Sequence, residues 1–363
     1  MRISEIETPA ILIDLDILER NLTRVASYAR DHDLRLRPHT KTHKIPAIGR
    51  MQVDAGAAGL TVAKVGEAEV MLASGTPDLL VAYPVIGRTK LDRLMEVARK
   101  TRVTVSLDSD VAARQLSDAA RAAQVEIGVL AEMDAGMNRV GVTPGPDLVE
   151  LCRRILNYPR LEFKGIAFYP GQLKLLDEDA DAQIAKLSQT VEAALHQLRA
   201  ASIECKVVSG GSTRCCTNRT VAGLNEIRPG TYIFNDRNTV ELAACKLEDC
   251  AATILCTVVS TARPGQIIID GGSKTFSSDR LATGDQGFGV VRDAPGAVFT
   301  KMNEEHGHID IRRSEKTDFQ VGDRLRVLPN HICVAMNLHE QVYGIRGDQV
   351  EHVWPVAARG KLQ

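Results

Sequence analysis

The chain alternates short runs of β-branched and apolar residues with longer amphipathic stretches between residues 34 and 230. Eight of the short runs are typical of strands, at residues 34–39, 60–64, 79–83, 102–108, 126–134, 162–169, 205–210 and 225–230. Eight strand-then-helix units in succession favour a (β/α)8 barrel over a doubly wound sheet. No G-x-G-x-x-G turn follows the first strand, as a dinucleotide-binding fold would need. The sequence therefore predicts an α/β fold of the TIM-barrel class.

Beyond residue 240 the pattern changes to short alternating runs broken by Gly, Pro and Asp, with almost no helical period. We predict two domains, a barrel at residues 1–240 and a C-terminal all-β domain at 241–363. The run ILIDLD at 11–16 precedes a helical stretch, and residues 1–16 are candidates to pair with the C-terminal sheet. A length of 363 residues fits this division, because single cores stop growing near about 250–300 residues.

Charge and composition restrict the partners of such a protein. Lys and Arg number 45 against 46 Asp and Glu, for a net charge of −1, so no basic field attracts nucleic acid or an anionic membrane. The start lacks a signal peptide, and no window approaches the roughly 20 apolar residues of a membrane span. The 8 cysteines contain no C-x-x-C pair and are typical of a reducing compartment. We expect a cytoplasmic protein that acts on a small molecule.

The first barrel strand ends in a polar segment, LRLRPHTKTHK. The face predicted to point into the barrel carries Arg35, Arg37, His39 and Lys41. Lys41 would lie at the rim, where the active sites of such barrels are found. Neighbouring cations and burial favour its neutral amine, the form that makes a Schiff base with a carbonyl. A solvated surface cluster is the alternative.

Glycine-rich segments follow the last two predicted strands, SGGST at 209–213 and RPGTY at 228–232. Glycines let the backbone approach an anion closely, and Ser212, Thr213 and Thr231 add hydroxyl donors. The loops after strands 7 and 8 are the usual phosphate site of a TIM barrel. A plain turn would explain the first segment alone, but the pair indicates a phosphorylated cofactor.

The segment NHIC in the β domain places His331 and Cys333 two residues apart on a predicted strand. Both side chains would then leave the same face and share one divalent ion. A buried core histidine beside a buried cysteine is the alternative, and the spacing alone favours it.

Together these segments resemble the D-threonine aldolase and D-serine dehydratase family, fold type III pyridoxal-phosphate enzymes related to alanine racemase. The resemblance rests on TPAILIDLD, RPHTKTHK, DAGMNRVG, GGST, RPGTYIFND and HIC, and it covers nearly the whole chain. It implies pyridoxal 5'-phosphate and a divalent metal as cofactors, a D-amino acid as substrate and, by analogy with relatives of the fold, a homodimer.

The resemblance also implies roles for individual residues. Lys41, rather than Lys44, would hold the cofactor covalently, and Arg228 would face the pyridine nitrogen. His331 and Cys333 would be metal ligands, which reverses the preference that spacing alone gave. The predicted catalytic residues are Lys41, Tyr169 and Arg139, and the predicted cofactor-binding residues are Lys41, His39, Tyr169, Gly211, Ser212, Thr213, Arg228, Gly230 and Thr231.

Two positions bear on the reaction type. Aldolase members commonly carry His-x-Asp at the metal pair, whereas dehydratase members carry His-x-Cys, as this chain does. A thiolate favours zinc, with manganese or magnesium as alternatives. Aldolases also tend to have a histidine six residues after the equivalent of Tyr169, where this chain has Leu175.

The leading hypothesis is therefore a dehydratase that converts D-serine or 3-hydroxyaspartate to a 2-oxo acid and ammonia. The alternative is an aldolase that cleaves D-threonine or another 3-hydroxy-D-amino acid to glycine and an aldehyde. More remote are a racemase, with Tyr343 as its second base, and a non-catalytic carrier of the cofactor, which would lack the β domain. Arg139, Arg214 and Arg237 are all open as binders of the substrate carboxylate.

Overall fold

The computed structural model describes residues 1–173, 179–213, 221–281, 283–284 and 287–363, and the chain divides into two compact units. The barrel unit contains residues Arg24–Lys41, Pro46–Gly230 and Gly360–Gln363. The β unit contains Met1–Thr23, Thr42–Ile45 and Thr231–Arg359. Within the described ranges, no helix has the length and apolar character that crossing a membrane requires.

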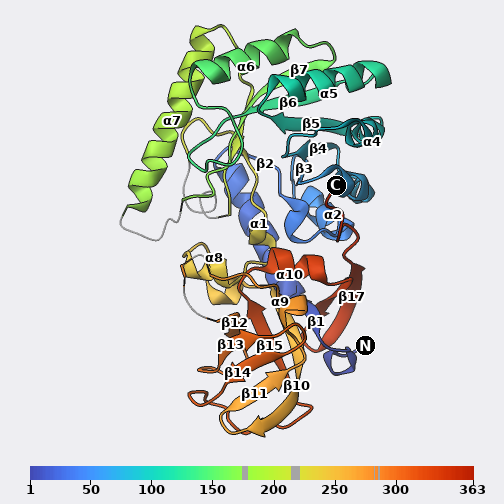
Figure 1. Cartoon of the computed structure of the whole chain (residues 1–363), viewed down its shortest axis with the longest axis vertical. Helices are drawn as coiled ribbons and strands as arrows, with labels where there is room; N and C mark the ends of the chain where they lie inside the picture. Colours follow the sequence, from blue (N-terminus) through green and yellow to red (C-terminus); the bar gives the residue numbers. More distant parts are fainter. Residues whose placement is uncertain (174–178, 214–220, 282, 285–286) are drawn as a thin grey trace. The chain divides into compact units, whose positions relative to one another are not determined.

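A parallel sheet in the order β2-β9-β8-β7-β6-β5-β4-β3 forms the centre of the barrel unit (Figure 1). Its strands are β2 (Arg35–Leu36), β3 (Leu60–Val62), β4 (Asp78–Val81), β5 (Arg102–Leu107), β6 (Ile127–Glu132), β7 (Leu161–Ala167), β8 (Val207–Gly210) and β9 (Glu226–Ile227). Each of the eight predicted strands overlaps one of them. A parallel bridge between His39 and Thr61 joins the two ends of the sheet. This order and closure confirm the predicted (β/α)8 barrel.

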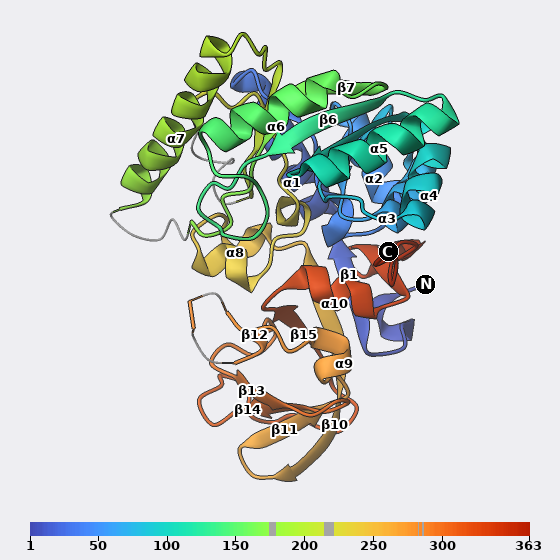
Figure 2. The same cartoon turned by 45° about the horizontal axis from the view of Figure 1, so that its top comes forward.

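Helices cover the outside of this sheet (Figure 2). They are α2 (Pro46–Asp54), α3 (Val65–Met71), α4 (Arg88–Ala98), α5 (Asp110–Ala123), α6 (Pro146–Asn157) and α7 (Ala180–Ala200). Local signals set their ends: Ser109 caps α5 by accepting the backbone N–H of Ala112, and Pro146 begins α6. Between the strands, Leu80, Leu130, Ala167 and Val207 form an apolar cluster.

The β unit contains a sheet in the order β11-β14-β13-β12-β15-β10-β1-β16-β17. Its strands are β1 (Ala10–Asp14), β10 (Ala252–Arg263), β11 (Gln266–Ile269), β12 (Gly289–Val291), β13 (Val298–Met302), β14 (Gly307–Asp310), β15 (Arg324–Pro329), β16 (Gln341–Arg346) and β17 (Gln349–Pro355). The long strand β10 pairs with β15 over Ile254–Thr257 and with β11 over Val258–Arg263. Strands β10 to β15 therefore close into a ring.

Strand β1 lies between β10 and β16 in this sheet, antiparallel to the first and parallel to the second. Its residues Ala10 and Leu12 join an apolar cluster with Leu255 and Ile345. The segment after it forms α1 (Leu15–Asp31), whose first part belongs to the β unit and whose last part belongs to the barrel unit.

Beyond residue 240 the sequence indicated almost no helix, but the described residues there include α9 (Ser273–Phe276) and α10 (Ile332–Leu338). A further short helix, α8 (Arg237–Glu241), lies at the predicted domain boundary. The predicted strand at His331–Cys333 is wrong, because His331 is the N-cap of α10 and Cys333 lies in its first turn. A helix of seven residues is too short for its period to show clearly in the sequence.

Candidate active site

Lys41 lies in the loop after β2, within the 3-10 helix η2 (Thr40–Thr42). Neighbouring strands hold this loop: the backbone N–H of His39 donates to the Pro229 carbonyl at 2.9 Å, and that of Thr61 donates to the Pro38 carbonyl at 2.7 Å. The half-buried side chain of Lys41 points to Tyr169, with Nζ 5.7 Å from the ring centroid. The lysine is thus at the carboxyl end of the barrel strands, where the sequence placed it.

Lys44 is in a different environment. It is buried in the β unit, and its Nζ donates to the Ala358 carbonyl at 3.3 Å. This contact joins Ala358, near the C-terminus, to the Thr42–Ile45 segment. Lys44 therefore has a structural role.

Tyr169 lies two residues after the end of β7, and Lys41 and Arg139 both lie beside its ring. The Arg139 guanidinium carbon lies 5.1 Å from the ring centroid. A Cβ atom at Gly171 would stand 2.4 Å from Tyr169 Cε1, so this position needs glycine for the ring to lie where it does. The three residues predicted to be catalytic are therefore neighbours in the barrel unit.

The loop that carries Arg139 follows β6 and is organised by one carboxylate. Asp134 Oδ1 accepts the backbone N–H groups of Gly136, Met137 and Asn138 at 2.9, 2.9 and 3.1 Å. Gln172 Nε2 donates to the Ala135 carbonyl at 2.6 Å, which ties this loop to the segment after Tyr169.

The two glycine-rich segments lie side by side, because each follows one of the paired strands β8 and β9. The Arg228 backbone N–H donates to the Gly210 carbonyl at 3.1 Å. Gly211 adopts a φ of +80°, which favours glycine and turns the backbone before Ser212 and Thr213. Gly230 lies in the second segment. Thr231 directly follows Gly230 in the chain and belongs to the β unit.

The buried Arg228 side chain is held by two neighbouring strand ends. Its Nη1 donates to Ser209 Oγ at 2.8 Å, and its Nη2 donates to the Phe168 carbonyl at 2.9 Å. Because a guanidinium presents five N–H donors in a rigid plane, these bonds set the direction of the whole group. His39, half-buried at the same edge, accepts the backbone N–H of Lys41 at Nδ1 at 3.4 Å.

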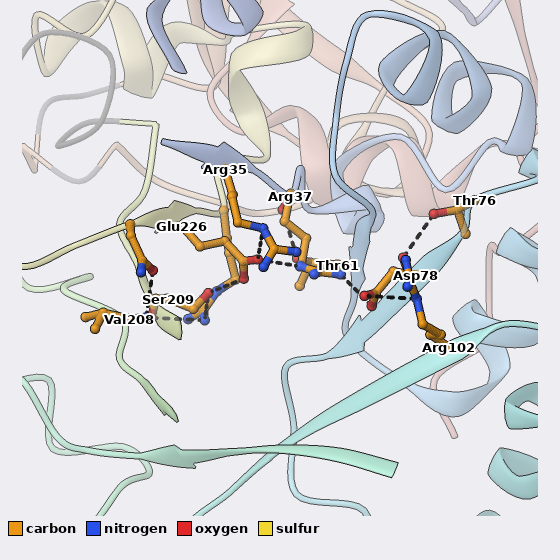
Figure 3. A network of polar contacts seen from close by, with 11 residues as sticks. Arg35, Arg37, Thr61, Thr76, Asp78, Arg102, Val208, Ser209 and Glu226 are labelled. Carbon is orange, nitrogen blue, oxygen red and sulfur yellow. Dashed lines mark hydrogen bonds and ion pairs between the residues drawn. The ribbon is translucent and has the colours of Figure 1, made fainter. Parts of the chain in front are cut away.

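Ser209, which accepts Arg228 Nη1, also belongs to a buried ion-pair network shown in Figure 3. Ser209 Oγ donates to Glu226 Oε1 at 2.7 Å, Glu226 Oε2 accepts Arg37 Nε at 3.0 Å, and Arg37 Nη1 donates to Asp78 Oδ1 at 2.8 Å. Burial lowers the pKa of Arg37, but Glu226 and Asp78 outweigh it, so the pKa is raised above its ordinary value. Arg37 is thus committed to two buried carboxylates.

Replacing Arg37 by Met is expected to destabilise the barrel strongly. The substitution leaves Glu226 and Asp78 buried without their shared cation, and loss of one partner from a buried ion pair typically costs about 3–5 kcal/mol. Urea unfolding followed by far-ultraviolet circular dichroism measures the change. The matched control is Arg50→Met, whose ion pair with Asp54 on α2 is exposed and should contribute little. Equal losses in the two variants would contradict this assignment.

His331 and Cys333 are brought together at the start of α10. Cys333 Sγ lies 3.2 Å from Thr42 Oγ1 and 3.9 Å from Thr231 Oγ1. The charge of Cys333 raises the pKa of His331 well above its ordinary value, as do the hydrogen bonds of His331 to Asp236 and Cys333, against the effect of burial.

Among the described residues, no group of three His, Cys, Asp or Glu side chains is arranged to hold a metal ion. The predicted pair would therefore supply two ligands, a thiolate and an imidazole nitrogen, which suit zinc.

Sequence reasoning missed two buried carboxylates, Glu226 and Asp236. Glu226 lies within a predicted strand, and the sequence does not show that it meets Arg37, 189 residues away. Asp236 could have been recognised as an N-cap, because Thr239 follows at the capping-box spacing. Its contact with His331, 95 residues away, has no local signal.

The remaining candidates have separate surroundings. Tyr343 in β16 packs against the apolar cluster around Leu12, and its hydroxyl accepts Gln341 Nε2 at 2.7 Å. Arg237 forms an ion pair with Glu241 at 3.4 Å on α8. Arg214 and Leu175 lie outside the described residues.

Two family models match the chain. Residues 13–238 match the one described as alanine racemase, N-terminal domain, and residues 251–345 match a putative serine dehydratase domain. A 3-hydroxy-D-aspartate aldolase of Paracoccus denitrificans is 34% identical, over 99% of this chain and 93% of the relative. The chain belongs to the D-threonine aldolase and D-serine dehydratase family. The recognition made from its motifs is thereby confirmed.

Other relatives in this family carry different activities. A D-threo-3-hydroxyaspartate dehydratase of Delftia sp. is 34% identical over 91% of this chain and 92% of the relative. The crystal structure of D-threonine aldolase from Filomicrobium marinum has a TM-score of 0.91 at 32% identity, covering 100% of this chain and 98% of that one.

Two solved variants of a D-threo-3-hydroxyaspartate dehydratase are also similar to this chain. Their TM-scores are 0.89 and 0.87, and each is 30% identical to this chain. Both matches cover 98% of this chain, and they cover 96% of the first variant and 98% of the second. One replaces a histidine by alanine, and the other replaces a cysteine two residues further along and is a metal-free form.

Proposed function

We propose that this protein is a pyridoxal-phosphate- and divalent-metal-dependent lyase of β-hydroxy D-amino acids, acting first as a dehydratase. D-Serine and 3-hydroxyaspartate are the leading substrates, with a 2-oxo acid and ammonia as products. The observation that carries the reaction type is the His331–Cys333 pair. The same spacing of histidine and cysteine occurs in the dehydratase whose cysteine variant is metal-free.

The barrel unit supplies groups that fit pyridoxal phosphate. Lys41 offers an amine at the strand ends, the backbone turn at Gly211 offers N–H donors beside Gly230, and the Tyr169 ring offers a flat surface next to the amine. The Arg228 guanidinium is held in one direction by Ser209 and Phe168. These residues are proposed to hold the cofactor, and His331 with Cys333 to hold the ion, zinc in preference to manganese or magnesium.

When bound, the cofactor withdraws electrons from the bonds at the substrate Cα, and the ion acts as a Lewis acid on the β-hydroxyl. The chain's residues then have separate tasks. Lys41 Nζ accepts the proton of Cα as general base. Arg139, beside the same tyrosine ring, binds the substrate carboxylate through its paired N–H donors. Tyr169 orients both side chains, which lie beside its ring.

Retro-aldol cleavage is the second candidate function. It is favoured by the 34% identity to a 3-hydroxy-D-aspartate aldolase over 99% of this chain. In that reaction the β-hydroxyl proton leaves and the Cα–Cβ bond breaks, so the products are glycine and an aldehyde.

A product assay separates the two reactions. The holoenzyme is incubated with D-serine, D-threonine and D-3-hydroxyaspartate, with and without a chelator, and ammonia, 2-oxo acid and glycine are quantified. We expect ammonia and a 2-oxo acid in equal amounts, and no turnover after chelation. Glycine from D-threonine without ammonia would replace the dehydratase by the aldolase, and full activity in chelator would remove the metal from the proposal.

A further inference from the structure

Asp236 is a fully buried carboxylate whose two oxygens bind the starts of two different helices. Oδ1 accepts the backbone N–H of Thr239 at 2.9 Å and the Thr239 hydroxyl at 3.1 Å. Oδ2 is 2.8 Å from His331 Nδ1 and accepts the backbone N–H of Ile332 at 3.2 Å. One side chain therefore joins the start of α8 to the start of α10.

These contacts select the protonation of the His331 ring. Two backbone N–H groups point at Asp236, and a carboxylate can only accept hydrogen bonds, so the proton of a neutral His331 belongs on Nδ1. The lone pair of that tautomer is then on Nε2. A histidine that binds a metal through one nitrogen normally donates its other N–H to such a carboxylate or carbonyl.

The same oxygen also holds the backbone between the two predicted ligands. Ile332 lies between His331 and Cys333, and its N–H donates to the oxygen that faces the His331 ring. Asp236 thus holds both the His331 ring and the backbone that leads to Cys333. Thr239 holds the other oxygen, so the carboxylate itself has little freedom to turn.

We propose that Asp236 is the positioning residue of the metal pair, holding His331 so that Nε2, and not Nδ1, binds the ion with Cys333. This inference rests on the proposed function, because it requires His331 to be a metal ligand. It adds Asp236 as a residue that acts on the ion through His331 without binding the ion itself.

The first test measures zinc affinity of the full-length holoenzyme by competition with a fluorescent chelator. We expect Asp236→Asn to weaken zinc binding by about 10–100-fold, the usual loss when a ligand's hydrogen-bond partner is removed. The bound-cofactor spectrum should stay unchanged. Asp249→Asn is the matched control, since this carboxylate is in the same unit and caps η5 (Leu247–Asp249) by accepting Lys246 N–H at 3.0 Å. His331→Ala reports whether the histidine binds zinc at all.

The outcomes distinguish the two proposals. Equal zinc affinity of the wild type and His331→Ala would overturn the metal site and this inference with it. Loss in His331→Ala with wild-type affinity in Asp236→Asn would overturn the inference alone.

A second test needs no variant and covers the case in which Asp236→Asn does not fold. Nitrogen-15 NMR of zinc-loaded protein labelled at histidine should show His331 with a proton on Nδ1 and the metal on Nε2. Zinc on Nδ1 would overturn the proposal.

Discussion

Lys41→Ala is expected to abolish the visible absorbance of lysine-bound pyridoxal phosphate and to lower turnover by about 10²–10⁴-fold, the usual range for loss of a general base. The physical reason is that this amine lies at the carboxyl edge of the barrel, next to Tyr169 and within the same rim as the Gly211 and Gly230 segments. An absorbance spectrum of the purified variant with added cofactor is sufficient for the first readout.

Two other lysines are controls for this result. Lys64 follows β3 at the same edge of the barrel, and its Nζ lies 3.5 Å from the Tyr83 ring centroid. Lys64→Ala removes a similar cation–aromatic contact and should keep the absorbance. Lys44→Ala removes the contact with Ala358 and should also keep it. Absorbance that survives in Lys41→Ala and disappears in Lys44→Ala would show that the wrong lysine was chosen.

Cys333→Ala is expected to release the divalent ion and to lower turnover. Mutation of a residue that only hydrogen-bonds to a metal ligand typically costs about 10–100-fold, and loss of a ligand itself should cost more. The sulfur is one of the two metal ligands that the His331–Cys333 pair is proposed to supply. Its loss leaves His331 as the single ligand of that pair. Metal content by plasma emission spectroscopy after dialysis, together with ammonia release from D-serine, measures both effects.

Cys205→Ala is the matched control for this variant. Cys205 is also half-buried, but it lies in the barrel unit and its thiol donates to the Val207 carbonyl at 3.3 Å. It should keep its metal and its turnover. If Cys333→Ala retains zinc and full turnover, the ion is not held by this pair and the preference for a dehydratase loses its support.

Local patterns in the sequence were sufficient for the barrel and for several candidate side chains. Strands such as residues 102–108 and 126–134 were recognised because each is a short run rich in β-branched and apolar residues, as buried parallel strands are. The segments around Lys41 and Tyr169 each follow a predicted strand. Because the carboxyl ends of parallel strands lie at one edge of the barrel, the proximity of these two segments could be predicted. The turn at Gly211 was indicated by residue type, because its φ of +80° favours glycine.

The helix at Ile332–Leu338 was not predictable in the same way. Its seven residues are separated from a strand by two residues, and alternation over so short a segment does not separate strand from helix. The carboxylate of Asp236 supports the helix start by accepting the Ile332 N–H, and this partner comes from a distant part of the chain.

The sequence by itself determined the barrel class, the lysine at the end of the first barrel strand and the His-x-Cys pair, because each depends on residue type and spacing over a few positions. Only the tertiary structure decided that Arg37 is neutralised by Asp78 and Glu226 and that Asp236 holds His331. These contacts join residues 41 to 189 positions apart. The packing of the strands and helices decides which buried charges pair. A buried ion needs an oppositely charged partner, and only the folded chain determines which residue lies close enough.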